Sequence, residues 1–213
     1  MTDGPRRFLT RRWLIIAALV AAAVAVGIGL TIGGAAGERV GSGVPRPASP
    51  QQQAAPTAGG IPPGFVGFRE EQGRFSLAYP ADWAAVGRSG DVELLVTKGR
   101  AASLLVRSVP LAFEVGPRGL PAVKRLTDSI VASGKQVTLL GESRRIELGG
   151  LPGWFYFYSF RDRSGRLGVH SHYFLFQGST MITLVFQARP ADEFRRYARS
   201  FDRIAGTFRA APR

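Results

Sequence analysis

The 213-residue chain contains no cysteine, no asparagine and only two histidines, His170 and His172. The absence of cysteine excludes disulfides, thiolate metal sites, a cysteine nucleophile and a lipid-modified N-terminal cysteine. The absence of asparagine excludes N-glycosylation. Two histidines alone make a histidine-rich metal centre or a Ser-His-Asp site hard to assemble.

Motifs that mark enzymes are also missing. Gly134-Lys135 is no phosphate loop, because Ser129 stands where the first glycine is needed and Gln136 where a Ser or Thr must follow. There is no Gly-x-Ser-x-Gly elbow. We therefore expect no catalytic residues, no metal and no cofactor. The alternative is an exported hydrolase whose carboxylate site has no recognisable sequence pattern.

Basic residues outnumber acidic ones by 28 to 15, which gives a net charge of +13. Residues 64–213 hold 22 basic and 13 acidic side chains, and only three basic residues of the whole chain are lysine. Codon usage in a GC-rich genome produces such an arginine bias. The functional interpretation is attraction to anionic lipid or to an acidic polymer of the cell envelope.

Residues 13–36 form a run of 24 residues without a charge. As a helix this run is about 36 Å long, which exceeds the ~30 Å of a bilayer core. Four arginines precede it within residues 1–12, so the positive-inside rule places that basic tail in the cytoplasm and residues 37–213 outside. The run is thus predicted to be a transmembrane signal anchor. The alternative is a secretory signal cleaved near residues 33–36, which exports the same domain. In either case nucleic acid is not an expected partner.

Small residues recur every four positions along the predicted anchor. They form a stripe with a GxxxG pattern that allows two helices to pair closely, as a sensor or regulatory subunit requires: Ala21, Ala25, Gly29 and Gly33. In a helix so rich in alanine and glycine the same stripe also arises by chance. Residues 37–63 are rich in Pro, Gly, Ser and Gln and predict a disordered linker. Such a tether would keep the following domain close to membrane-bound partners.

Residues 64–213 are predicted to be one extracytoplasmic α+β domain, an antiparallel β-sheet flanked by helices. Strands separated by short turns come first, then a helix from Pro121 to Gly134, then more strands and a final helix from Pro190 to Ile204. The expected strands are 65–69, 74–79, 91–98, 102–109, 136–148, 154–161, 169–177 and 181–188. The absence of strict βαβ alternation argues against a doubly wound nucleotide-binding fold.

The final helix has an apolar face and a basic one. Its arginines recur on the side opposite the apolar residues and are candidates for contact with an anionic surface: Arg195, Arg196, Arg199 and Arg203. The alternative is a solvated helix face on which Asp192, Glu193 and Asp202 balance these charges.

Two other groups of residues were candidate sites. Alternate aromatic residues of the strand 154–161 share one face and belong either to the core or to a groove for a sugar or peptide: Trp154, Tyr156 and Tyr158. His170 and His172 share a strand face with Phe174. Two histidines supply half of a zinc site at most, so we expect an ordinary exposed or hydrogen-bonded pair.

Three short motifs, in this order, resemble the PsbP-like family. Phe75–Trp83 is similar to the strand and Tyr-Pro-x-x-Trp sequence that open such domains. Leu151-Pro152-Gly153 is similar to the loop before a middle strand, and Phe201–Arg209 to the closing helix with its Ser/Thr-Phe end. The resemblance covers about residues 65–209. It implies the α/β/α sandwich of PsbP and of LpqN-type envelope lipoproteins, used for binding and assembly, and it transfers no binding residue.

The sequence therefore predicts a non-catalytic, membrane-anchored binding or accessory module of the bacterial cell envelope. Its expected partner is another membrane or envelope protein, or an anionic lipid or polymer. The alternatives are the exported hydrolase and the sensor or regulatory subunit.

Overall fold

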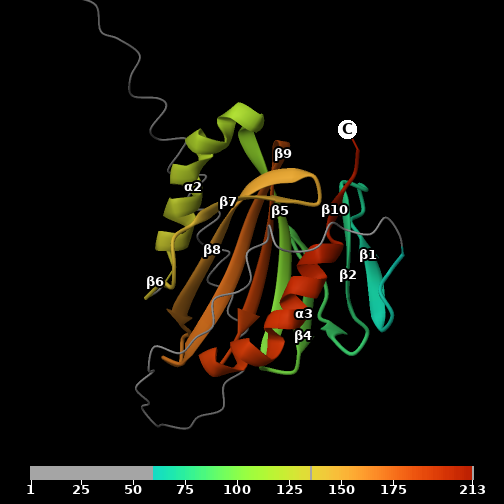
Figure 1. The fold of residues 1–213 in the computed structure, drawn as a ribbon, viewed down its shortest axis with the longest axis vertical. Helices are drawn as coiled ribbons and strands as arrows, with labels where there is room; N and C mark the ends of the chain where they lie inside the picture. The colour runs from blue at the N-terminus through green and yellow to red at the C-terminus, as the bar shows by residue number, and fades with distance from the viewer. Residues whose placement is uncertain (1–59, 135, 213) are drawn as a thin grey trace, which may run out of the picture.

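The computed structural model describes residues 60–134 and 136–212, which form two antiparallel sheets and two α-helices (Figure 1). Two 3-10 turns, η2 (Pro117–Gly119) and η3 (Ala191–Glu193), each lead into a helix. The helices are α2 (Leu120–Ala132) and α3 (Phe194–Thr207). The strands are β1 (Phe65–Arg69), β2 (Phe75–Pro80), β3 (Ala84–Ala85), β4 (Val92–Lys98), β5 (Ala102–Val115), β6 (Thr138–Leu139), β7 (Arg144–Leu148), β8 (Leu151–Arg161), β9 (Leu167–Ala188) and β10 (Arg209–Ala210).

The smaller sheet has the order β1-β2-β10. β1 and β2 form the predicted hairpin, in which Phe65 pairs with Pro80 and Arg69 with Ser76. The turn between them closes at Gly73, which adopts a φ of 71° that favours glycine. β10 joins the other edge of β2, so this sheet unites the two ends of the domain.

The larger sheet has the order β3-β4-β5-β9-β8-β6, with β7 also paired to β8. β9 is a long hairpin, because its first half pairs with β8 while its second half pairs with β5. The two halves lie side by side, as the contact between His170 and Gln187 shows. The reversal occurs at Gly178, whose φ is 59°, where the sequence predicted a turn.

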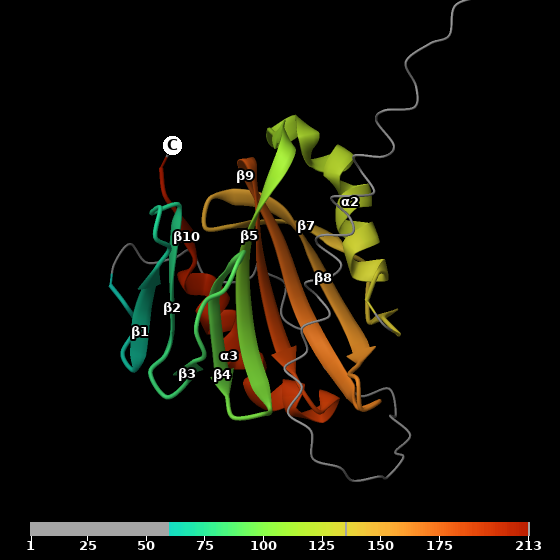
Figure 2. The same ribbon diagram turned by 180° about the vertical axis from the view of Figure 1, so that it is seen from behind.

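Helices cover both faces of the larger sheet (Figure 2). On one face Phe155, Phe157 and Tyr173 pack in a core with residues of α3. On the other face Tyr156 and Phe174 pack in a second core with residues of α2. Successive residues of a strand point to opposite faces, and this explains why the aromatic run of β8 is apolar without alternation.

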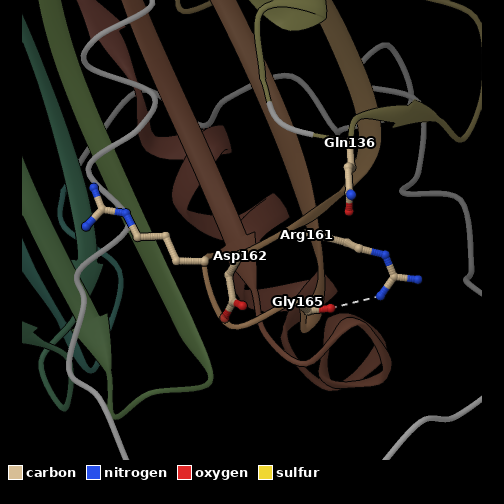
Figure 3. Close-up of a pocket in the computed structure, with 5 residues that line it drawn as sticks. Gln136, Arg161, Asp162 and Gly165 are labelled. Atoms are coloured by element: carbon tan, nitrogen blue, oxygen red, sulfur yellow. Dashed lines mark hydrogen bonds between the residues drawn. The ribbon is translucent and has the colours of Figure 1, made fainter.

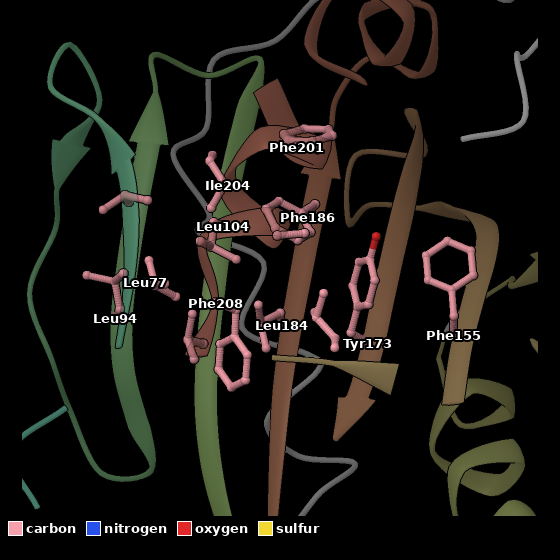
Figure 4. Packing of buried hydrophobic residues seen from close by; sticks show 14 of the residues in the cluster. Leu77, Leu94, Leu104, Phe155, Tyr173, Leu184, Phe186, Phe201, Ile204 and Phe208 are labelled. Carbon is pink, nitrogen blue, oxygen red and sulfur yellow. The ribbon is translucent and has the colours of Figure 1, made fainter. Parts of the chain in front are cut away.

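The core beneath α3 combines aromatic rings with aliphatic side chains (Figure 4). Phe201 of α3 lies against Phe186 of β9, with ring centres 5.2 Å apart. Trp83, which follows β2, is 6% exposed and meets the rings of Tyr197 and Phe201 edge-on, at 6.2 Å in each case. The tryptophan of the Tyr-Pro-x-x-Trp motif therefore packs against the closing helix.

Most expected elements are present, but several have changed limits. Leu151, Pro152 and Gly153, which resembled the loop before the middle strand, are instead the first residues of β8. The turn lies just before them, at Gly149 and Gly150, whose φ values of 60° and 85° favour glycine. β5 continues to Val115 instead of stopping at Val109. Pro110 still pairs in register with Thr180 of β9, and the register shifts between Pro110 and Val115. The region 136–148 contains two strands, β6 and β7. The last helix ends at Thr207, three residues beyond the expected end at Ile204.

The predicted antiparallel α+β domain with flanking helices is thus confirmed. The predicted anchor 13–36, its small residues Ala21, Ala25, Gly29 and Gly33, and the linker up to residue 59 lie outside the residues that the structure describes. Within 60–134 and 136–212, no helix has the length and apolar character needed to cross a lipid bilayer.

Candidate functional site

Helix α3 places a row of arginines at the surface. Its inward side is formed by apolar residues at helical spacing, all buried: Phe194, Tyr197, Phe201, Ile204 and Ala205. Burial of these rings fixes the rotation of the helix about its axis, so that the four predicted arginines face solvent: Arg195, Arg196, Arg199 and Arg203. We call these four residues the arginine face.

Acidic side chains lie next to the arginine face. Glu193 lies 3.6 Å from Arg196, which also lies over the ring of Tyr197. Asp202 is half-buried, and burial raises the pKa of its carboxyl group. Burial, together with the charge of Asp202, raises the pKa of Tyr173 in the core. The carboxylate of Asp202 is thus partly withdrawn from solvent, whereas the four arginine side chains are exposed.

The arginine face adjoins the point where the described chain joins the domain. The guanidinium carbon of Arg203 lies 4.6 Å from the ring centre of Phe65, the first residue of β1. Ile61, just before that strand, is 58% exposed and covers Gly67, where an added Cβ would lie 2.6 Å from its Cδ1 atom. Phe65 and Gly67 are two positions apart and share one face of β1. Basic and apolar side chains thus meet at the start of the domain.

The two histidines belong to a buried hydrogen-bonded chain. Nε2 of His170 donates to Oε1 of Gln187 at 3.0 Å, so Nδ1 of the neutral His170 ring accepts the hydroxyl proton of Tyr158 at 3.1 Å. The Tyr158 oxygen then accepts Nδ1–H of His172 at 3.1 Å. The opposite nitrogen of His172, Nε2, is buried without a hydrogen-bond partner among the described residues. The sequence predicted an exposed or a hydrogen-bonded pair; the structure shows the hydrogen-bonded one, with both rings buried.

Burial keeps this chain neutral. It lowers the pKa of His170 to about 4 despite the opposing hydrogen bond to Gln187. Burial also lowers the pKa of His172, and the electrostatic interactions with His170 and with the guanidinium of Arg107 lower it further. Burial raises the pKa of Tyr158. Within 60–134 and 136–212 no group of three or more acidic or histidine side chains is placed to hold a metal ion, and both Nδ1 atoms are occupied by Tyr158.

The aromatic side chains that were candidates for a ligand groove lie beneath α2. Tyr156 and Tyr158 are 1% and 2% exposed. The Tyr156 hydroxyl lies 2.6 Å from Oγ1 of Thr127 and 2.8 Å from a carboxylate oxygen of Asp128. The indole N–H of Trp154, which is partly exposed, donates to the carbonyl of Leu120 at 3.1 Å. In this structure neither tyrosine ring is open to a ligand.

A shallow hollow lies at the turn between β8 and β9 (Figure 3). It is lined by Gln136, Arg161, Asp162, Arg163 and Gly165. Asp162 is committed to the turn, because its carboxylate accepts hydrogen bonds from Ser164, from the backbone N–H of Arg166 and from Arg189. Burial alone would raise the pKa of Asp162, but these interactions hold it below its ordinary value. The sequence predicted the turn and gave no sign of the hollow.

No protein-family model and no curated protein sequence matches this chain. Solved structures do share its fold. LpqN, described as involved in cell envelope biogenesis of Mycobacterium tuberculosis, matches with a TM-score of 0.51 at 14% identity, over 65% of this chain and 83% of LpqN.

Two further structures are similar. A protein from Bacteroides thetaiotaomicron VPI-5482 matches with a TM-score of 0.51 at 11% identity, over 70% of this chain and 49% of its own, so this chain spans about half its length. Cyanobacterial PsbP (CyanoP) from Synechocystis sp. PCC 6803 matches with a TM-score of 0.48 at 18% identity, over 73% and 98% of the two chains. At these identities the likeness shows the fold alone. At that level the resemblance to LpqN-type domains is confirmed.

Proposed function

We propose that this protein is a non-catalytic binding or accessory module of the bacterial cell envelope, anchored by residues 13–36 and displayed outside the cytoplasmic membrane. The arginine face of α3 is the surface through which it binds its partner. The observation that carries the proposal is the division of α3 into five buried apolar residues and four exposed arginines. The buried apolar residues serve to pack α3 on the sheet, whereas the four arginines project into solvent and suit an anionic partner.

The chemistry of the described residues supports a binding role over a catalytic one. The histidine pair and Tyr158 are buried and hydrogen-bonded to one another, so they have no access to a substrate. Asp162, in the shallow hollow, is used to hold its own turn. The enzyme alternative would need a group that is both reactive and accessible.

The export part of the proposal rests on the sequence. The uncharged run 13–36 follows a basic tail, and this arrangement favours a cytoplasmic N-terminus. The linker 37–63 would then hold the domain within reach of the membrane surface. The fold shared with LpqN, a protein whose published description places it in envelope biogenesis, is compatible with this location.

Proteolysis of intact spheroplasts tests the topology. Proteinase K added from outside should remove the C-terminal domain and leave a short fragment containing residues 13–36 in the membrane. Lysed spheroplasts treated in the same way provide the control for protease access. Protection of the domain in intact spheroplasts would overturn the proposal. Recovery of a soluble exported domain that begins after residue 36 would show that residues 13–36 belong to a cleaved signal and not to a membrane anchor.

A further inference from the structure

The arginine face has the right position to meet the membrane from which the domain is suspended. The chain reaches the domain at Ile61 and enters β1 at Phe65, beneath the guanidinium of Arg203. The proposed anchor and the linker up to residue 60 precede this point. The attachment of the tether and the basic end of α3 are therefore neighbours in space, although residues 65 and 203 are far apart in sequence.

The chemistry of this surface suits lipid headgroups. Arg195, Arg199 and Arg203 recur every four residues, so their Cα atoms follow one another at about 6 Å along the helix axis. Guanidinium groups bind phosphate oxygens through two parallel hydrogen bonds. Beside them are an exposed aliphatic side chain, Ile61, and the partly exposed ring of Phe65. Basic residues bordered by apolar ones are typical of surfaces that rest at a membrane interface.

The strength of this attraction depends on how close the arginine face is held to the bilayer. At physiological ionic strength attraction between exposed charges fades over about 8 Å, so a freely diffusing domain gains little from three arginines. A tethered domain meets the bilayer at high effective concentration, and weak contacts then suffice.

We propose that the arginine face docks the domain reversibly on anionic phospholipid headgroups beside its own anchor, with Ile61 and Phe65 at the contact. This inference rests on the proposed function, because it requires an exported, anchored domain. It adds the identity of one binding partner, the phosphate-bearing lipid surface, and a defined orientation in which α3 faces the bilayer and α2 faces away from it.

The absence of cysteine allows a direct test with a single fluorescent label. Ser200→Cys places the label on α3, between Arg199 and Phe201. Ser129→Cys places it on the exposed side of α2, on the opposite face of the sheet. Each full-length variant is inserted into nanodiscs of phosphatidylcholine alone or of equal parts phosphatidylcholine and phosphatidylglycerol. Lipids that carry a quencher on the headgroup report contact with the label.

If the domain docks, the label on Ser200→Cys should be quenched in the presence of phosphatidylglycerol, and this quenching should fall with added salt. The label on Ser129→Cys should show little quenching. Replacing Arg195, Arg199 and Arg203 by glutamine should lower the docking equilibrium constant about five-fold for each arginine, or about 100-fold together. Replacing Arg118, Arg125 and Arg145, which are exposed elsewhere, removes the same charge and should leave docking unchanged.

Equal quenching at both labels, or quenching insensitive to lipid charge, would overturn the docking. So would an equal loss of docking in the two triple variants. A separate measurement tests the export that the proposed function requires: a membrane-impermeant maleimide should label Ser129→Cys in intact spheroplasts. Labelling without docking would refute the lipid contact and leave the exported module intact, whereas failure of labelling, with labelling restored on lysis, would refute the export itself.

Discussion

The hydroxyl group of Thr207 accepts the backbone N–H of Ala78 at 2.8 Å, which joins the last turn of α3 to the second strand of the domain. Its own proton is within reach of the carbonyl oxygens of Ile204, at 2.7 Å, and of Ala78, at 3.1 Å. The next residue, Phe208, stacks on Phe75 of β2 with ring centres 5.4 Å apart. The Thr-Phe pair at the end of the PsbP-like resemblance therefore links the two ends of the fold.

Removal of the Thr207 hydroxyl should weaken this link. Thr207→Val keeps the shape of the side chain but leaves the N–H of Ala78, which is 3% exposed, without its acceptor. We expect a loss of about 1–3 kcal/mol in the free energy of unfolding. Thr207→Ser keeps the hydroxyl and should lose about 0.8 kcal/mol for its methyl group. Urea unfolding compares the two, and a valine variant as stable as the serine variant would contradict the role of the hydrogen bond.

The histidine chain should make stability depend on pH. The pKa of His170 falls from 6.5 to about 4 on folding, so between these values the unfolded chain binds a proton that the folded chain does not. Stability is then fully present above about pH 6.5 and is lost as the pH falls towards 4. The contribution of His170 is about 3 kcal/mol, and the lowered pKa of His172 acts in the same direction.

His170→Gln isolates this contribution, because an amide can donate to Gln187 and accept from Tyr158 without titrating. Urea unfolding over the same pH range should show a shallower loss of stability for this variant than for the wild-type protein. Equal slopes for the two proteins would show that folding does not lower the pKa of His170.

Gly153 permits close contact between β8 and β9. An added Cβ would overlap the carbonyl oxygen of Phe174 and lie 2.9 Å from a methyl carbon of Leu175. Gly153→Ala should therefore lower the free energy of unfolding by about 1–3 kcal/mol. Gly116→Ala is the control, since no atom lies within 4 Å of its added Cβ, and it should change stability by less than about 0.5 kcal/mol. Thermal unfolding measures both, and similar melting temperatures would contradict the steric explanation.

The hydroxyl of Tyr156 should hold α2 on the sheet. Tyr156→Phe removes the hydrogen bonds to Thr127 and Asp128 while keeping the buried ring. We expect a loss of about 1–3 kcal/mol and faster hydrogen exchange of the α2 amides than of the α3 amides. Tyr79→Phe, on the smaller sheet, is the control for loss of a phenol group. Uniform acceleration in both helices would indicate global destabilisation instead.

Features with a local physical cause were predictable from the sequence. The β1–β2 hairpin follows from period-2 alternation around a glycine turn, and the exposure of the arginine face follows from the apolar positions of α3. The extension of β5 past Pro110 was not predictable, because a proline ordinarily interrupts a ladder, whereas here Pro110 pairs in register with Thr180 of β9. The sequence also did not predict the burial of His170, because this burial depends on which strands lie next to each other in the folded sheet.

The amino-acid sequence by itself determined the local elements, the aromatic character of the core and the rotation of α3, since each arises from spacing within one segment. Only the tertiary structure decided that Arg203 lies over Phe65 and that Tyr158 joins two histidines. These contacts join residues far apart in the chain or on neighbouring strands, and their formation depends on the order of the strands in the sheets and on the helix that covers each face. The spacing of residues within one segment does not reveal the order of the strands or the helix that covers each face of the sheet.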